Sequence, residues 1–170
     1  MWGSRTYSAE QTAADNAVLA LLTFGEGYHN YHHTLANDYR NGIRWYHFDP
    51  TKWLIWTASK IGLASNLRWV NEIRIKQTLV KNDKQLLLNR IRNEIDETAN
   101  ELREKLEDLS KQFEAKAAEL AKAYRELKVV TEERRHILLM EIKRLRRELR
   151  VDWKNWVSLT ELTEKHYALA

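Results

Sequence analysis

The segment from residue 71 to residue 170 contains neither glycine nor proline, and this feature constrains the fold more than any other. The segment also holds 41 of the 52 charged residues. Glycine and proline interrupt helices more strongly than other residues do. A segment rich in glutamate, lysine, arginine, leucine and alanine favours helix formation. The composition therefore predicts one or two long helices between residues 71 and 170.

Apolar residues form a stripe along one face of this predicted helical segment. Their steps of three and four average about 3.55 residues, between the values of a coiled coil and of a straight helix. The stripe consists of Leu88, Ile91, Ile95, Ala99, Leu102, Leu106, Leu109, Phe113, Ala117, Leu120, Tyr124 and Leu127, and then of Leu138, Ile142, Leu145, Leu149, Trp153 and Trp156. It needs a partner: itself in a hairpin, a second copy, or the rest of the domain. Residues 98–101 match a capping box and can mark a new helix start, although they lie in phase with the stripe.

A basic cluster precedes the two tryptophans at the end of this stripe. The cluster consists of Lys143, Arg144, Arg146, Arg147 and Arg150. A basic cluster next to tryptophan can rest on anionic lipid headgroups. The alternative is that the cluster is an ordinary solvent-exposed helix face. The net charge of +4 is too small to indicate a nucleic acid partner.

The first 70 residues have a different composition. They contain all five glycines, the one proline and five of the seven tryptophans, so we expect a boundary between segments 1–70 and 71–170. Residues 13–24 are expected to be helical, and residues 37–42 a turn. Asp49 and Pro50 are typical of an N-cap and a first helical residue. The predicted helix over 51–70 mixes tryptophan with basic residues, which suits either a membrane–water interface or packing on protein.

No segment is predicted to span a membrane. The longest apolar runs, residues 17–22 and 53–56, are far shorter than the roughly 20 residues that a spanning helix needs. The first residues also lack the apolar core and cleavage site of a signal peptide.

Half of the six histidines lie in five consecutive positions. On a helix, His29, His32 and His33 occupy positions i, i+3 and i+4, so their rings share one face. Converging imidazoles are typical ligands of zinc, iron and copper, and the absence of cysteine excludes thiolate sites and disulfides. The alternatives are a polar helical turn with chance histidines, or half of an adventitious zinc site. We interpret His136 and His166, which are isolated, as surface residues.

Residues 25–33, with the sequence GEGYHNYHH, resemble the third histidine box of membrane-bound acyl-CoA (stearoyl-CoA type, delta-9) fatty acid desaturases in their bacterial form. The resemblance continues through residues 38–46 (DYRNGIRWY) and 49–53 (DPTKW). The charged segment after residue 70 resembles an extension of some bacterial members in composition only.

The resemblance implies a di-iron, oxygen-dependent membrane enzyme. Such an enzyme introduces a cis double bond into a fatty acyl-CoA with electrons from a separate donor protein. His29, His32 and His33 match the box histidines that ligate iron there. Glu26 could orient these rings but is not assigned as a ligand. His47 lies outside the box and is expected to be structural.

The chain departs from the family by lacking two earlier histidine boxes and an Asn-x-x-x-His element upstream of the third box. We therefore expect Met1 to be an internal methionine of a longer protein. Since three histidines cannot hold two irons in a catalytic geometry, the chain alone should be inactive. The alternative function is a non-enzymatic helical interaction module with a vestigial or zinc-binding histidine patch, and a third is a peripheral membrane segment.

The expected fold is all-α. Short helices should surround the histidine box, followed by the amphipathic helix and by a long charged helix or helical hairpin of coiled-coil type. Lipid or further helices are expected to cover the apolar faces of residues 13–24 and 53–69.

Overall fold

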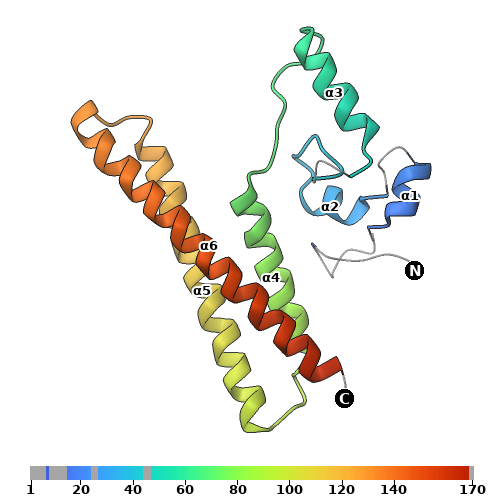
Figure 1. Ribbon diagram of the computed structural model, residues 1–170, viewed down its shortest axis with the longest axis vertical. Coiled ribbons are helices and arrows are strands. Elements are labelled where there is room, and N and C mark those ends of the chain that lie inside the picture. The colour runs from blue at the N-terminus through green and yellow to red at the C-terminus, as the bar shows by residue number, and fades with distance from the viewer. Residues whose placement is uncertain (1–6, 8–14, 24–26, 44–46, 169–170) are drawn as a thin grey trace. The chain divides into compact units, whose positions relative to one another are not determined.

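The computed structural model describes residues 7, 15–23, 27–43 and 47–168, which contain six helices and no strand beyond an isolated bridge between Asp15 and Tyr28 (Figure 1). The helices are α1 (Ala17–Leu22), α2 (His29–Thr34), α3 (Pro50–Lys60), α4 (Glu72–Arg90), α5 (Glu97–Glu126) and α6 (Glu132–Ala168). The predicted all-α fold is confirmed.

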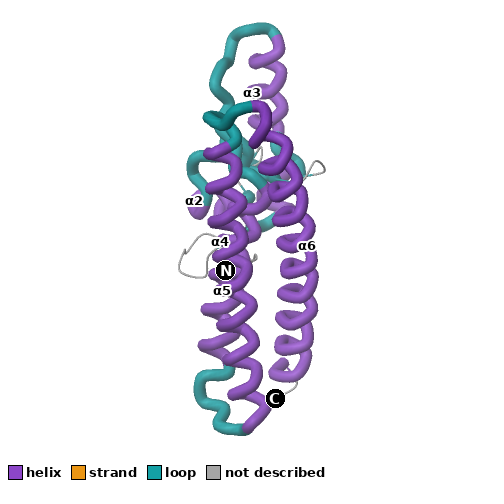
Figure 2. The backbone as a smooth tube through the Cα atoms, turned by 90° about the vertical axis from the view of Figure 1, so that its left-hand side faces the viewer, coloured by secondary structure: helices purple, strands orange, loops and turns teal. Residues whose placement is uncertain are grey.

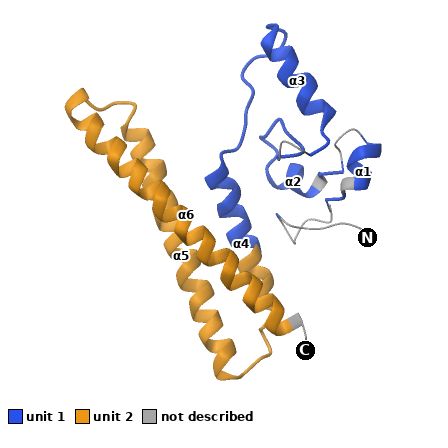
Figure 3. Cartoon of the chain, in the orientation of Figure 1, with its two compact units in different colours: residues 1–82 blue, residues 83–170 orange. Residues whose placement is uncertain are grey.

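The chain forms two compact units, residues 1–82 and residues 83–170 (Figure 3). The division between them falls inside α4, whereas the composition of the sequence changes near residue 70. The functional boundary at residue 70 stays a prediction. In the described part of the chain, no helix combines the length and the hydropathy needed to cross a membrane.

The second unit is built on an antiparallel hairpin of α5 and α6 (Figure 2). Of the three partners that the sequence allows for its apolar stripe, the structure selects the hairpin. The core residues of the two helices include Leu106, Phe113, Ala117, Leu120, Leu138, Ile142, Leu145, Leu149 and Trp156. These nine belong to the predicted stripe, because a step near 3.5 residues keeps one face of each helix toward the other. Near the end of α5, however, Ala123 is buried and the predicted stripe residue Tyr124 is 41% exposed.

An ion pair joins the two helices of the hairpin. The Lys116 Nζ atom of α5 lies 2.7 Å from a carboxylate oxygen of Asp152 in α6. Asp152 is buried, so this oxygen has little access to water and depends on Lys116 as its partner. The pair therefore favours one register of α5 against α6.

The stripe is interrupted between α4 and α5. Ile95, a predicted stripe residue, is 90% exposed because the chain leaves the helix after Arg90. The next helix starts with Asp96, whose carboxylate accepts a hydrogen bond from the Ala99 amide at 3.3 Å, so the start lies two residues before the predicted Thr98. Arg103 closes the turn by donating to the carbonyl of Ile91.

The C-terminal half of α4 contacts both helices of the hairpin through side chains. The Trp156 indole donates to the Asp83 carboxylate at 3.1 Å, and Lys84 lies 3.5 Å from Glu107. Trp156 is only 1% exposed. The predicted place of Trp156 in the apolar stripe is confirmed, and its buried ring cannot accompany the basic cluster onto lipid headgroups.

In the first unit, α3 begins as predicted and ends earlier. The Asp49 carboxylate accepts a hydrogen bond from the Lys52 amide at 2.9 Å, and Pro50 is the first helical residue. The helix ends at Lys60, so the predicted helix over 51–70 is wrong in its second half. Gly62 (φ 79°) and Asn66 (φ 54°) adopt left-handed backbone conformations that a right-handed helix does not allow.

Helix α1 is likewise shorter than predicted. It begins at Ala17, because the Asn16 side chain caps it by accepting hydrogen bonds from the amides of Val18 and Leu19. Residues 13, 14 and 24 of the predicted helix lie outside the described residues. Several apolar side chains on α1 and α3 are exposed, namely Val18, Leu19, Leu21, Leu22, Trp53, Leu54 and Trp56. Their coverage by lipid or by another helix stays a prediction.

The partly buried carboxyl of Asp83 should make the second unit pH-sensitive. Burial raises the pKa of Asp83 to about 6, the charge of Glu164 adds to this, and the hydrogen bond from Trp156 opposes it. The folded state then binds a proton more tightly than the unfolded state, so this group's contribution to stability falls as pH rises from about 4 to about 6. The variant Asp83→Asn keeps an oxygen acceptor for Trp156 and loses the titration. The difference in free energy of unfolding between this variant and the wild type should therefore shift by about 2 kcal/mol in favour of the variant from pH 4 to pH 7.

Urea unfolding followed by circular dichroism at the two pH values measures this difference. The exposed Asp108 of α5 provides the matched control, Asp108→Asn, which should track the wild type. If the stability of Asp83→Asn depends on pH as that of the wild type does, the raised pKa of Asp83 is not the source of the pH dependence.

Candidate metal centre

Helix α2 carries the histidine cluster and is held at its N-terminal end by a distant carboxylate. Tyr28 at the N-cap position makes no side-chain capping bond. Instead, one Asp15 carboxylate oxygen accepts hydrogen bonds from the amides of Asn30 (2.9 Å) and Tyr31 (3.3 Å). A negative charge at the start of a helix satisfies its free amides and suits its dipole. No local sequence signal indicates this cap, because fifteen residues separate Asp15 from Asn30.

Gly27 allows the chain to approach α1 closely just before α2. Its carbonyl accepts a hydrogen bond from the Asn16 amide at 2.7 Å. A Cβ atom at Gly27 would lie 2.1 Å from the backbone nitrogen of Ala20, so no other residue fits without moving the backbone. Gly27 is therefore required here for the close approach of the chain to α1.

The structure places the predicted ligands on two turns of α2. The rings of His32 and His33 lie 6.0 Å apart between centroids, with an angle of 77° between their planes. The side chains of His29 and Glu26 lie outside the description. Within the described part, no group of three or more histidine, aspartate or glutamate side chains could hold a metal ion. The three-histidine ligand set thus stays a prediction.

One nitrogen in this cluster has the property expected of a ligand. The Nδ1 atom of His32 is buried and has no hydrogen-bond partner among the described residues. An unpaired buried nitrogen costs free energy unless a proton donor or a metal ion satisfies it. Neutral imidazole is a suitable ligand for iron and zinc, so His32 fits a metal site.

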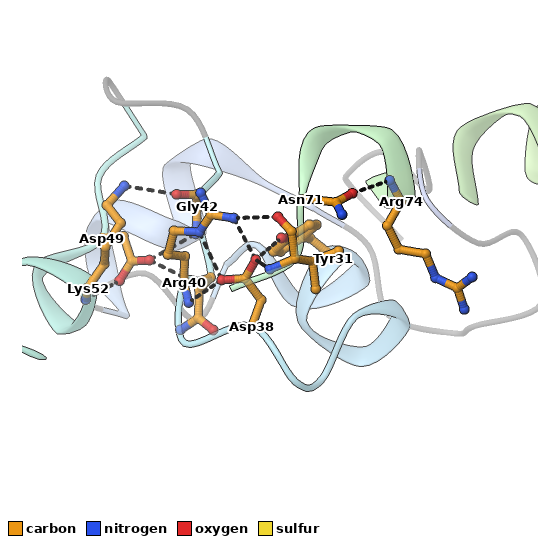
Figure 4. Close-up of polar contacts among 10 residues, drawn as sticks. Tyr31, Asp38, Arg40, Gly42, Asp49, Lys52, Asn71 and Arg74 are labelled. Carbon is orange, nitrogen blue, oxygen red and sulfur yellow. Dashed lines mark hydrogen bonds and ion pairs between the residues drawn. The ribbon is translucent and has the colours of Figure 1, made fainter. Parts of the chain in front are cut away.

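Tyr31 anchors α2 from its other side through a buried carboxylate (Figure 4). The Tyr31 hydroxyl donates to Asp38 at 2.6 Å, and the Arg40 guanidinium donates to both Asp38 oxygens at 2.8 and 2.6 Å. The Val70 amide donates to the same carboxylate at 2.9 Å, and Arg40 reaches the Val70 carbonyl at 3.2 Å. These bonds join α2, the following turn and the chain just before α4.

Charges in this network are strongly stabilised. Burial alone would raise the pKa of Asp38, but the hydrogen bonds from Arg40 and Tyr31 outweigh it and hold the pKa below its usual value. Burial and the Asp38 charge raise the pKa of Tyr31 well above its ordinary range, so its hydroxyl stays a donor. The network is therefore an ionised carboxylate with its donors, and it has a structural role.

A second carboxylate organises the turn that follows. Asp49, which caps α3, also accepts hydrogen bonds from the amides of Asn41 (2.8 Å) and Gly42 (2.9 Å). The Lys52 ammonium donates to the Gly42 carbonyl at 2.8 Å, and burial lowers the pKa of this lysine. The turn predicted over 37–42 is thereby tied to the start of α3.

His47 packs on the residue that precedes α2. Its ring stacks on the Tyr28 ring with 4.5 Å between centroids and 9° between planes. A Cβ atom at Gly42 would lie 2.5 Å from the His47 Cβ, so the absence of a side chain at Gly42 permits the stack. These contacts agree with the expected structural role of His47.

The polar framework explains much of the long sequence motif after the histidines. Asp38, Arg40, Asn41, Asp49 and Lys52 are all engaged with backbone or with one another. The spacing Asp-x-Arg inside a turn and a tyrosine on a polar helix are signals that could have indicated these contacts. Their pairing could not be read from the chain, since Asp38 also contacts Val70, 32 residues away.

Comparison with known proteins identifies relatives of one class. The chain is 45% identical over 94 residues to a "Probable acyl-CoA desaturase" of Schizosaccharomyces pombe, an alignment that covers 55% of this chain and 19% of the relative. It is 41% identical over 83 residues to "Acyl-CoA desaturase 1" of Saccharomyces cerevisiae, covering 49% and 16%. An "Icosanoyl-CoA 5-desaturase" of Limnanthes douglasii is 35% identical over 81 residues, covering 48% and 23%.

The chain thus spans about a fifth of the length of the curated relatives it matches. No family model and no solved structure matches it. The resemblance to acyl-CoA desaturases that the histidine box predicted is confirmed.

Removal of the Asp38 charge should loosen the frame around α2. The variant Asp38→Asn leaves the Arg40 guanidinium without its counter-charge in a mostly buried place, which should cost roughly 3 kcal/mol. Hydrogen exchange at the Val70 and Arg40 amides, both of which donate to Asp38, should accelerate strongly. Asp108→Asn, an exposed change in α5, should leave these amides unchanged. Equal protection in wild type and Asp38→Asn would show that the network does not hold the frame.

Proposed function

We propose that this chain carries part of an acyl-CoA desaturase and supplies His29, His32 and His33 as iron ligands. The observation that carries the proposal is the similarity to acyl-CoA desaturases, together with the buried, unpaired Nδ1 atom of His32. The reaction is the oxygen-dependent introduction of a cis double bond into a fatty acyl-CoA. Its electrons come from a separate donor protein, and the complete enzyme works in a membrane.

The histidines of α2 would hold the metal as neutral imidazoles. When bound, a di-iron group supplies the abstraction of hydrogen from an unactivated methylene, which no side-chain acid or base can perform. The work of this chain is to present its ring nitrogens in a fixed arrangement. A helix is suited to this because positions i, i+3 and i+4 share one face.

The polar frame would keep these rings in place. Asp15 holds the first amides of α2, and Asp38 holds Tyr31, which lies beside His32 in the chain. Neither carboxylate is proposed as a ligand. Their role is positional: groups that orient ligands influence metal affinity nearly as much as the ligands do.

Three imidazoles do not complete a di-iron centre, so the proposal requires further ligands from outside residues 1–170. The chain by itself should then lack desaturase activity. Most of the contacts to the acyl chain and to coenzyme A would likewise come from other parts of the complete enzyme.

A non-enzymatic helical module is the alternative function. An apolar stripe left exposed, which another protein would have to cover, would support this alternative. In the second unit, α5 and α6 cover the stripe of each other, so the hairpin itself does not call for a second copy. We therefore favour the desaturase.

Metal binding by the isolated chain tests the ligand assignment. Titration with Co²⁺ as a spectroscopic substitute for Fe²⁺ should show binding that weakens at least about tenfold in His32→Ala. His136→Ala and His166→Ala, which change isolated histidines of α6, are the matched controls and should bind as the wild type does. Equal affinity in His32→Ala, with the helical circular dichroism unchanged, would remove His32 from the ligand set.

A chimera tests the activity. The aligned region of the Saccharomyces cerevisiae acyl-CoA desaturase 1 is replaced by the matching residues of this chain, and unsaturated acyl products are measured by gas chromatography. The chimera should retain activity because the replaced segment would present the same ligands, and His32→Ala in it should abolish activity. A chimera that is membrane-inserted, correctly sized and inactive would count against the proposal.

A further inference from the structure

A groove with a basic lining lies between the C-terminal end of α5 and the first half of α6. Its volume is about 550 Å³, and its walls include Tyr124 of α5 and Leu139 of α6. Four cations line it from α6, namely Lys143, Arg146, Arg147 and Arg150. All of these residues belong to the second unit, so the groove does not depend on the candidate metal centre.

The four cations lack a bonded counter-charge in the part of the chain that the structure describes. None of them forms a hydrogen bond or an ion pair there. Two acidic residues near them on α6 are engaged elsewhere: Glu148 pairs with Arg144 at 3.1 Å, and Asp152 pairs with Lys116. A third, Glu141, forms no ion pair with any of the four cations in the described part of the chain. Four like charges within about two helical turns repel one another, and a bound anion would relieve that repulsion.

The chemistry of the lining favours a phosphate group. Arginine binds phosphate through two parallel hydrogen bonds, and three of the four cations are arginines. Tyr124, which is 41% exposed, brings a hydroxyl from the other helix. The groove is thus suited to a phosphate held between α5 and α6.

Apolar side chains on the same face of α6 distinguish a lipid from a soluble phosphate compound. Met140 is 59% exposed and Val151 is 52% exposed. They lie three residues before Lys143 and four residues after Arg147, so they flank the cations on one side of the helix. Exposed apolar residues beside a basic cluster are typical of a helix that rests on a membrane surface.

We propose that this groove binds the phosphate groups of anionic lipid headgroups, with Met140 and Val151 entering the boundary of the acyl chains. The proposal retains the lipid interpretation of the basic cluster and removes Trp156 from it. It adds to the proposed function a surface by which the α5–α6 hairpin lies on a membrane, and it does not require the metal centre.

A single-site probe tests this proposal in the full chain. Because the sequence contains no cysteine, Val151→Cys can be labelled alone with an environment-sensitive fluorophore. Addition of vesicles of phosphatidylcholine with phosphatidylglycerol should shift its emission to the blue, and vesicles of phosphatidylcholine alone should not. The label on Leu162→Cys, another exposed apolar position of α6, is the control and should shift much less.

Charge variants then identify the groove. On the labelled chain, the double variant Arg147→Gln, Arg150→Gln should bind anionic vesicles about thirtyfold more weakly. This corresponds to a loss of about fivefold in affinity for each cation removed. Arg134→Gln with Arg135→Gln removes the same charge from α6 outside the groove and should change it less than about threefold. Equal losses of vesicle binding in the two double variants would overturn the proposal that the groove is the binding site, because binding would then depend on net charge alone.

Titration with soluble phosphate compounds shows whether the groove binds the phosphate of lipid headgroups or that of soluble molecules. Glycerol phosphate and inorganic phosphate are titrated into the labelled chain without vesicles. A response to these compounds that the Arg147→Gln, Arg150→Gln variant abolishes, with no response to anionic vesicles, would overturn the lipid assignment. Binding to anionic vesicles that declines with added salt and depends on the groove arginines would support it.

Discussion

The Asp38 carboxylate is the interaction on which the histidine-bearing unit depends. It accepts hydrogen bonds from Tyr31 in α2, from Arg40 in the following turn and from Val70 before α4. These segments share no regular secondary structure, so no ladder of backbone bonds could join them. A buried, ionised acceptor can hold several donors at once, and loss of its charge would leave Arg40 without a partner in a place of low water access.

The second unit is held together by a different kind of force. Its two long helices bury a continuous apolar stripe, and one ion pair between Lys116 and Asp152 favours their register. The cations around Arg147 belong neither to this core nor to the ion pair, and they line the groove between α5 and α6. Surface charge that folding does not use is available for binding, and this is the physical basis of the lipid groove.

Several elements were predictable because their signals are local. The Asp49 cap, the Pro50 start and the apolar stripe of α5 and α6 depend on neighbours within a few residues, and the structure bears them out. The end of α3 at Lys60 was not predicted, because the apolar pattern continues past this residue and does not indicate the left-handed backbone of Gly62 and Asn66. The hydrogen bond between the Trp156 indole and Asp83 was not predicted, because the two residues lie 73 positions apart in the chain.

The sequence by itself determined that the chain is helical, that three of its histidines stand at positions i, i+3 and i+4, and that its composition changes near residue 70. Each of these follows from spacing along the chain, which is the same in any tertiary arrangement. Only the tertiary structure decided that the stripe closes on itself as a hairpin, that Asp15 and Asp38 hold α2, and that the groove cations form no ion pair with any described residue. Those facts depend on which distant side chains meet, and a periodic pattern carries no information about that choice.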